Sequence, residues 1–154
     1  MTERPAKILA VDLGLRSGLA VFAEDGELVR YRSTNFGSRR RLKKAVYGLI
    51  REAGPPQILV LEGARNLASI WEKAAEKQGV EVICVAPETW RQDLLVPRQR
   101  RSGADAKEAA QDLAREIIEE RGGHRPTSLR HDAAEAILIG YWALLAPIFH
   151  ADAP

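Results

Sequence analysis

The stretch ILAVD at residues 8–12 decides the fold class, because four apolar residues run directly into a carboxylate. A second stretch, ILVLE at residues 58–62, repeats this pattern after an intervening helical segment. Continuous apolar runs bounded by turn signals are typical of strands buried on both faces of a sheet. We therefore predict two central strands, each ending in an acid, Asp12 in the first and Glu62 in the second.

The remaining elements follow from hydrophobic periodicity and from turn signals. The dipeptide Asp25-Gly26 joins two further apolar runs and predicts a hairpin. Ser38 is a candidate N-cap for an amphipathic helix that Gly54 and two prolines terminate. In chain order we predict strands at 8–11, 19–22 and 28–33, a helix ending near 53, a strand at 58–61, a helix at 66–78, a buried strand at 80–86, a helical turn at 88–95, a helix capped by Asp105, and a last helix at 131–145.

This order predicts an α/β fold, with a five-stranded mixed sheet that has three antiparallel strands followed by parallel ones. Helices should cover both faces of the sheet. The topology is expected to place the strand of Asp12 beside the strand of Glu62. The whole chain, 1–154, reads as a single domain with an ordered core at about 6–146.

Composition narrows the class of protein. The chain has 154 residues, of which 45% are hydrophobic and 29% charged, so its bulk is not disordered. Cys84 is the only cysteine, which excludes an internal disulfide, fits a reducing compartment and suggests core packing for that side chain. The segment MTERPAK at residues 1–7 does not resemble a secretory signal, and no clean membrane span is present. We expect a cytoplasmic protein that does not contact a membrane.

Four carboxylates form the candidate active site. Asp12 and Glu62 end central strands, whereas Asp132 and Glu135 lie three residues apart and so share a helix face. Strand-end acids can simply meet water, and first-turn acids suit the helix dipole. Together, however, four acids without a cysteine or histidine cluster suit Mg²⁺ or Mn²⁺. Two such ions can support phosphodiester hydrolysis.

Two basic segments suggest a polyanionic partner. Residues 30–51 contain eight Lys or Arg and no acid, and Arg39, Arg40 and Arg41 begin a predicted helix, where cations oppose the dipole. A second segment without acids, at 94–104, contains Arg98, Arg100 and Arg101 and lies between Arg91 and Lys107. Such segments can bind phosphates or can form a solvated surface.

Several other residues have a simpler structural interpretation. Gly14 and Gly18 match no nucleotide-binding fingerprint and suggest a tight turn with the backbone close to a ligand or metal. His131 at a helix start is more often structural than catalytic. Trp90 is expected to pack in the core, and Trp71 in the core or an interface.

The chain resembles the RuvC-type Holliday junction resolvases of the ribonuclease H-like superfamily. The matching segments are KILAVDLGLRSGLAV at 7–21, ILVLEG at 58–63, VICVAPETWR at 82–91, GADAKEAAQDLA at 103–114 and HDAAEAILIGYWAL at 131–144. Their order and spacing, rather than any one motif, carry the resemblance.

The resemblance implies that Asp12, Glu62, Asp132 and Glu135 bind two Mg²⁺ ions, for which Mn²⁺ can substitute. Arg91 and Lys107 match basic positions that contact DNA phosphates. The implied reaction is symmetric cleavage of a four-way DNA junction by a homodimer, leaving 5′-phosphates, and the helix at 66–78 matches the dimer helix. The family usually has Asp where this chain has Glu135, which could shift metal preference toward Mn²⁺.

Other functions remain open at this point. A related nuclease could act on RNA precursors or on other branched DNA, and a non-catalytic junction- or RNA-binding module could share the fold. An actin-like phosphotransferase fragment is disfavoured because the chain is too short for the second lobe. The resemblance fits a bacterial cytoplasm or, for a phage protein, that of an infected host cell.

Overall fold

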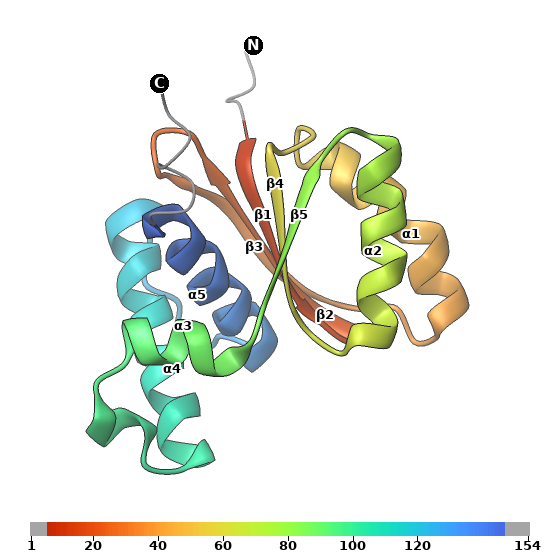
Figure 1. Cartoon of the computed structure of the whole chain (residues 1–154). Helices are drawn as coiled ribbons and strands as arrows, with labels where there is room; N and C mark the ends of the chain where they lie inside the picture. Colours follow the sequence, from red (N-terminus) through yellow and green to blue (C-terminus); the bar gives the residue numbers. More distant parts are fainter. Residues whose placement is uncertain (1–5, 147–154) are drawn as a thin grey trace.

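The computed structural model describes residues 6–146, which form a five-stranded mixed sheet covered by helices on both faces (Figure 1). The strand order is β3-β2-β1-β4-β5. The strands are β1 (Ala6–Leu13), β2 (Arg16–Ala23), β3 (Leu28–Asn35), β4 (Ile58–Gly63) and β5 (Glu81–Val85). The helices are α1 (Arg39–Glu52), α2 (Arg65–Lys77), α3 (Pro87–Leu94), the short 3-10 helix η1 (Pro97–Arg100), α4 (Gly103–Arg121) and α5 (His131–Leu145).

The sheet topology confirms the predicted fold class. Strands β1, β2 and β3 form an antiparallel meander, and β4 and β5 add in parallel beyond β1. The parallel pairing of β1 with β4 sets Asp12 directly opposite Glu62. The two strand-end acids are therefore neighbours, as the predicted topology requires.

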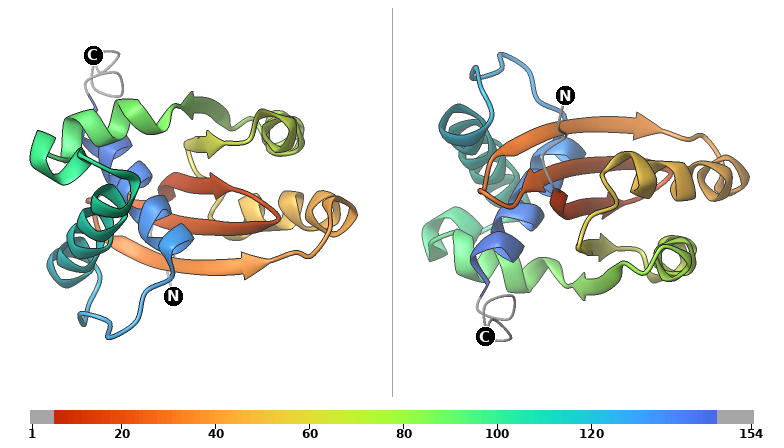
Figure 2. Two further views of the ribbon diagram at one scale, coloured as in Figure 1. Left: turned by 90° about the horizontal axis from the view of Figure 1, so that it is seen from below. Right: turned by 90° about the horizontal axis from the view of Figure 1, so that it is seen from above.

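The core consists of two layers, one on each face of the sheet. Ile8 and Ala10 of β1 face α5, whereas Leu9 and Val11 face α1 and α2. Since α5 is packed between the sheet and α4, it is apolar around most of its circumference. Figures 1 and 2 show α1 and α2 on one face, with α3, α4 and α5 on the other.

A close backbone contact fixes the start of α5 against β2. A Cβ atom added to Gly18 would lie 1.9 Å from the carbonyl oxygen of Asp132. Gly18 also pairs with Asp12 across the β1–β2 ladder. The glycine predicted to approach a ligand or metal therefore instead lets α5 approach the sheet.

The structure corrects two predictions about element boundaries and burial. Ser38 caps α1 as predicted, but α4 is capped by Ser102, whose Oγ accepts a hydrogen bond from the Asp105 backbone N–H. Asp105 instead lies in the first turn, where its charge complements the helix dipole. The strand predicted at 80–86 is present as β5, but the prediction that it is buried is wrong, because β5 is an edge strand with only β4 beside it.

The position of β5 at the edge also corrects the prediction for Cys84, which is exposed rather than packed in the core. Trp71, by contrast, is completely buried against the α1–α2 face of the sheet. Within residues 6–146, no helix is long and apolar enough to cross a membrane. Residues 1–5, which carry most of the segment considered for a secretory signal, lie outside the described range.

Candidate active site

Three of the four predicted acids converge at the carboxyl ends of β1 and β4. Asp12 and Glu62 project from adjacent strands toward α5, and Glu135 reaches them from the second turn of that helix. One carboxylate oxygen from each of these residues lies within 4.8 Å of the others. Glu62 and Glu135 are each only 5% exposed, so these carboxylates are largely removed from water.

Burial and mutual repulsion disfavour the ionised forms of this acid cluster. The pKa of Asp12 is raised from 3.8 to about 8, first by desolvation and then by the charges of Glu135, Glu62 and Asp132. The pKa of Glu62 is raised from 4.5 to about 7, again first by desolvation and then by Glu135. Both shifts arise first from burial and then from repulsion, and the nearby charge of Arg91 does not offset them.

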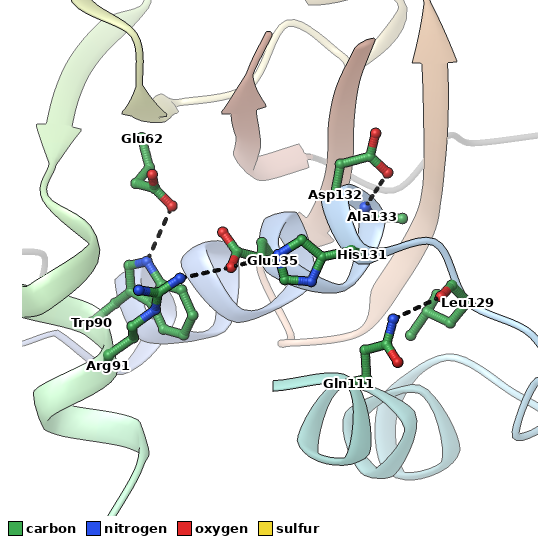
Figure 3. Close-up of polar contacts among 9 residues, drawn as sticks. All are labelled: Glu62, Trp90, Arg91, Gln111, Leu129, His131, Asp132, Ala133 and Glu135. Carbon is green, nitrogen blue, oxygen red and sulfur yellow. Dashed lines mark hydrogen bonds and ion pairs between the residues drawn. The ribbon is translucent and has the colours of Figure 1, made fainter. Parts of the chain in front are cut away.

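Two consecutive residues of α3 partly compensate the acids. The buried Trp90 donates its Nε1–H to Glu62 Oε2 at 3.3 Å, and Arg91 donates from Nη2 to Glu135 Oε1 at 3.0 Å (Figure 3). The Arg91 guanidinium also lies over the Trp90 ring, 5.2 Å from its centroid. The Trp90 hydrogen bond and the charge of Arg91 each lower the pKa of Glu62, but burial and the charge of Glu135 outweigh them.

His131 belongs to the same cluster. Its Nε2 lies 3.0 Å from Glu135 Oε1, the oxygen that Arg91 also contacts. The two residues are one helical turn apart on α5, so the helix itself sets this contact. His131 is thus a neighbour of the acids, a position that its sequence context did not distinguish from a structural role.

Asp132 lies beside this group rather than within it. Its Oδ2 accepts a hydrogen bond from Ser33 Oγ at 2.9 Å, and its Oδ1 accepts one from the backbone N–H of Ala133 at 2.8 Å. Its charge nevertheless contributes to the raised pKa of Asp12. Asp132 is therefore close enough to act electrostatically on the cluster, with its carboxylate held by β3 and α5.

Of the predicted DNA-contacting residues, only Arg91 touches the acids in the described part of the chain. Lys107 is exposed in the second turn of α4. Arg98 and Arg101 line a hollow with acids of α4, and Arg100 donates to the Leu95 carbonyl. The remaining members of the set, Arg39, Arg40 and Arg41, are exposed at the start of α1.

The donor set fits a hard divalent cation. Asp12, Glu62 and Glu135 offer only carboxylate oxygens, which Mg²⁺ and Mn²⁺ prefer, and no cysteine lies among them. Four acids face one arginine and one histidine, so positive charge is missing where the oxygens converge. A divalent cation bound by Asp12, Glu62 and Glu135, with Asp132 alongside, would supply that charge.

Sequence reasoning missed three contacts of this site: Trp90 with Glu62, His131 with Glu135, and Ser33 with Asp132. The i,i+4 spacing of His131 and Glu135 was a usable signal, because such residues face each other on a helix. Trp90 directly precedes Arg91, which the resemblance had singled out. Ser33 gave no signal, since its contact depends on how β3 packs against α5.

Solved structures with this architecture include two of Thermus thermophilus RuvC, one of them in complex with a Holliday junction substrate. The complex is 18% identical with a TM-score of 0.65, covering 92% of this chain and 94% of that one. The other is 19% identical with a TM-score of 0.68, covering 92% and 96%. The yeast mitochondrial Holliday junction resolvase Ydc2 is 13% identical with a TM-score of 0.55, covering 92% and 80%.

No protein-family model and no curated protein matches the chain. The structural similarity extends over nearly the whole length of both chains in the RuvC comparisons. The chain therefore has the ribonuclease H-like fold of RuvC, as its sequence predicted.

Proposed function

We propose that this protein is a metal-dependent endonuclease that resolves four-way DNA junctions. The observation that carries the proposal is the convergence of Asp12, Glu62 and Glu135 within 4.8 Å, at the carboxyl ends of central strands in a RuvC fold. A protein that only binds nucleic acid gains nothing from burying carboxylates that raise one another's pKa. The cluster is instead suited to chemistry at a phosphate.

The proposed metal ligands are Asp12, Glu62, Asp132 and Glu135. Bound Mg²⁺, or Mn²⁺ in its place, would supply a polarised water and stabilise the charge on the leaving oxygen. Asp12 pairs with Glu62 across the β1–β4 ladder, and its carboxylate lies within 4.8 Å of those of both Glu62 and Glu135, so it could share a cation with either. Trp90 and Arg91 keep Glu62 and Glu135 directed into the cluster.

The proposed reaction is hydrolysis of a phosphodiester without a covalent enzyme intermediate. The water oxygen forms the new bond to phosphorus, and the bond from phosphorus to the 3′-oxygen breaks. The water loses its proton to solvent, and the 3′-oxygen takes one from solvent, so the products are a 5′-phosphate and a 3′-hydroxyl. Because the pKa of Asp12 is about 8 in the absence of metal, binding of a cation there near neutral pH would release a proton.

Basic side chains would hold the DNA around this centre. Arg91 is adjacent to the acids and is proposed to contact phosphates nearest the cleaved bond. Lys107 belongs to α4, which packs against α5, and the loop arginines Arg98, Arg100 and Arg101 belong to or follow η1, which packs against α4, so they would contact an arm of the junction on that face. The exposed Arg39, Arg40 and Arg41 lie on the other face.

A homodimer remains a prediction, since paired cuts in a junction need two active sites. The apolar residues that the sequence offered for a dimer helix, Leu67, Ile70 and Trp71, are buried in the chain's own core. They therefore provide no exposed apolar surface on α2. A dimer through this helix would have to use its polar side chains.

The proposal is tested with labelled substrates in Mg²⁺ and in Mn²⁺. We expect paired, symmetric nicks in a synthetic four-way junction and no cutting of a linear duplex of the same sequence. Cutting of an RNA–DNA hybrid or of RNA instead would keep the acid cluster as the active site and change the substrate. Tight junction binding without cutting in either metal would contradict the nuclease proposal and favour a binding module.

A further inference from the structure

A basic groove runs between α1 and α2, on the opposite face of the sheet from α5. Its volume is about 200 Å³. The residues that line it include four cations, two hydroxyl-bearing side chains and no acid, namely Arg39, Lys43, Tyr47, Ser69, Ile70, Lys73, Ala74 and Lys77. We refer to it as the α1–α2 groove.

The walls of the groove are two columns of side chains at helical spacing. Arg39, Lys43 and Tyr47 recur every four residues on α1, and Ser69, Lys73 and Lys77 do so on α2. The helices run in the same direction side by side (Figure 1). Arg39 Nη1 donates to the Asn66 carbonyl at 3.0 Å near one end, and Gln78 Nε2 donates to the Tyr47 carbonyl at 3.0 Å near the other.

The fold does not account for this arrangement of charge. Within residues 6–146, none of the four groove cations forms an ion pair with an acid. Lysines of α1 and α2 instead face each other across the groove, which costs free energy through repulsion. Arg39 also lies in the first turn of α1, where a cation opposes the helix dipole.

We propose that the α1–α2 groove binds the phosphate backbone of a DNA duplex, as a second contact surface remote from the acids. The columns extend over eight residues of helix, or about 12 Å. One duplex strand carries a phosphate about every 3.4 Å along the axis, so this length spans about three phosphate intervals. The hydroxyl of Tyr47, whose side chain is exposed, can donate to a phosphate oxygen, whereas that of Ser69 already donates to the Asn66 carbonyl at 3.4 Å.

The groove is placed to continue a path that starts at the active site. Its Arg39 end lies against Asn66, which follows Glu62 by only one short turn of chain. A backbone leaving the acid cluster around this edge of the sheet would therefore reach Arg39 first and Lys77 last. This placement rests on the proposed function, whereas the affinity of the groove for duplex does not.

The alternative occupant is a second copy of the chain. Two α1–α2 grooves packed against each other would oppose eight cations, and their only exposed large ring is that of Tyr47. DNA neutralises the same charges and releases counterions. Charge complementarity therefore favours a polyanion.

The test measures duplex and junction binding of the full chain as a function of KCl concentration, without divalent metal. The groove variant is Lys43→Gln/Lys73→Gln. The control is Lys44→Gln/Arg51→Gln, which removes the same charge from exposed positions of α1 outside the groove lining. Loss of two phosphate contacts should make the slope of log K against log [salt] less steep, reducing its absolute value by about 1.8 for the groove variant. The control should keep the wild-type slope.

Two results would overturn the inference. The first is an unchanged slope in a folded groove variant. The second is a change in particle mass without a change in duplex affinity, which would assign the groove to a second copy of the chain. A groove-dependent slope on linear duplex would support the inference even if the wild-type chain failed to cut junctions. Junction cutting with a groove-independent slope would leave the proposed function intact and remove the groove from it.

Discussion

Trp90 shows how one buried side chain can prepare a carboxylate for its task. It is fully buried and its only polar atom points at Glu62, which is itself 5% exposed. A donor in this position favours the ionised carboxylate, the form that binds a cation. Packing and function therefore use the same residue, although its sequence context predicts packing alone.

We expect Trp90→Phe to raise the Mg²⁺ concentration needed for half-maximal cleavage, because the ring stays but the N–H that orients Glu62 is lost. Leaving a buried polar group unsatisfied costs about 1–3 kcal/mol, so a several-fold to about hundred-fold shift is expected. A metal titration of junction cleavage measures it.

Trp142→Phe is the matched control for this variant. The half-buried Trp142 also donates through Nε1, to Asp93 at 2.7 Å, but this hydrogen bond is exposed and involves none of the four acids. Its loss should leave the metal requirement unchanged. Equal shifts in the two variants would show that the Trp90 contact plays no specific part.

The residues of the site were predictable to different degrees for physical reasons. Asp12 and Glu62 follow apolar runs, and burying an acid there needs a partner or a cation, so their role could be inferred from the sequence. The position of Asp132 outside the group of three converging acids could not be inferred from the sequence, since its hydrogen bond to Ser33 joins segments far apart in the chain. That Asp132 binds metal stays a prediction.

The seating of α5 on the sheet depends on the absence of a side chain at Gly18. Because a Cβ there would overlap the Asp132 carbonyl, any larger residue must displace the start of the helix that carries Asp132 and Glu135. The same glycine pairs with Asp12. A displacement would therefore disturb both sides of the site.

We predict that Gly18→Ala lowers the free energy of unfolding by about 3 kcal/mol or more, the upper range for overpacking. Gly48→Ala is the control, because nothing lies within 4 Å of a Cβ built there, in the middle of α1. That change should be neutral or stabilise by about 0.5–1 kcal/mol. Denaturant unfolding of both variants checks this, and equal stabilities would contradict the close contact.

Elements were predicted best where local signals agree with packing. The apolar runs gave β1 and β4, and α5 spans the same residues as predicted, 131–145. The burial predicted for β5 and for Cys84 is wrong, because an apolar run is read as buried whether its strand is central or at an edge. Which strand lies at the edge of a sheet depends on long-range contacts, and a local sequence pattern does not report them.

The balance of charge in the folded molecule makes its stability depend on pH. Asp12 has an ordinary pKa of 3.8, which is also expected in the unfolded chain, and a folded pKa of about 8. Between these values the folded state binds more protons than the unfolded state. The contribution of Asp12 therefore makes the folded protein most stable below about pH 4 in metal-free buffer. This stability is lost as the pH rises through 8. Glu62, with a pKa of about 7, acts in the same direction.

We expect Asp12→Asn to melt at a higher temperature than the wild-type chain at pH 8 without metal, and the difference to shrink toward pH 4. A change of 1 kcal/mol corresponds to about 2–4 °C in a chain of this size. Added Mg²⁺ should stabilise the wild-type chain at pH 8 more than the variant. A variant that melts below wild type at pH 8 would show that the acids are not in electrostatic conflict.

At the scale of the whole molecule, the two proposed contact surfaces lie on opposite faces of one sheet. The face with α3, α4 and α5 carries the acids, Arg91 and the loop arginines, whereas the α1–α2 face carries the basic groove. The edge where β1 and β4 end connects the two. A branched nucleic acid that wraps this edge could contact both faces at once.

The most direct test of this account compares junction cleavage and junction binding by the wild-type chain and Asp12→Asn in the same samples, with Mg²⁺ present. The account predicts that both bind the four-way junction, that the wild type nicks it, and that the variant cuts at least about a hundred-fold more slowly. Cleavage by Asp12→Asn at the wild-type rate would contradict the assignment of the acid cluster as the active site.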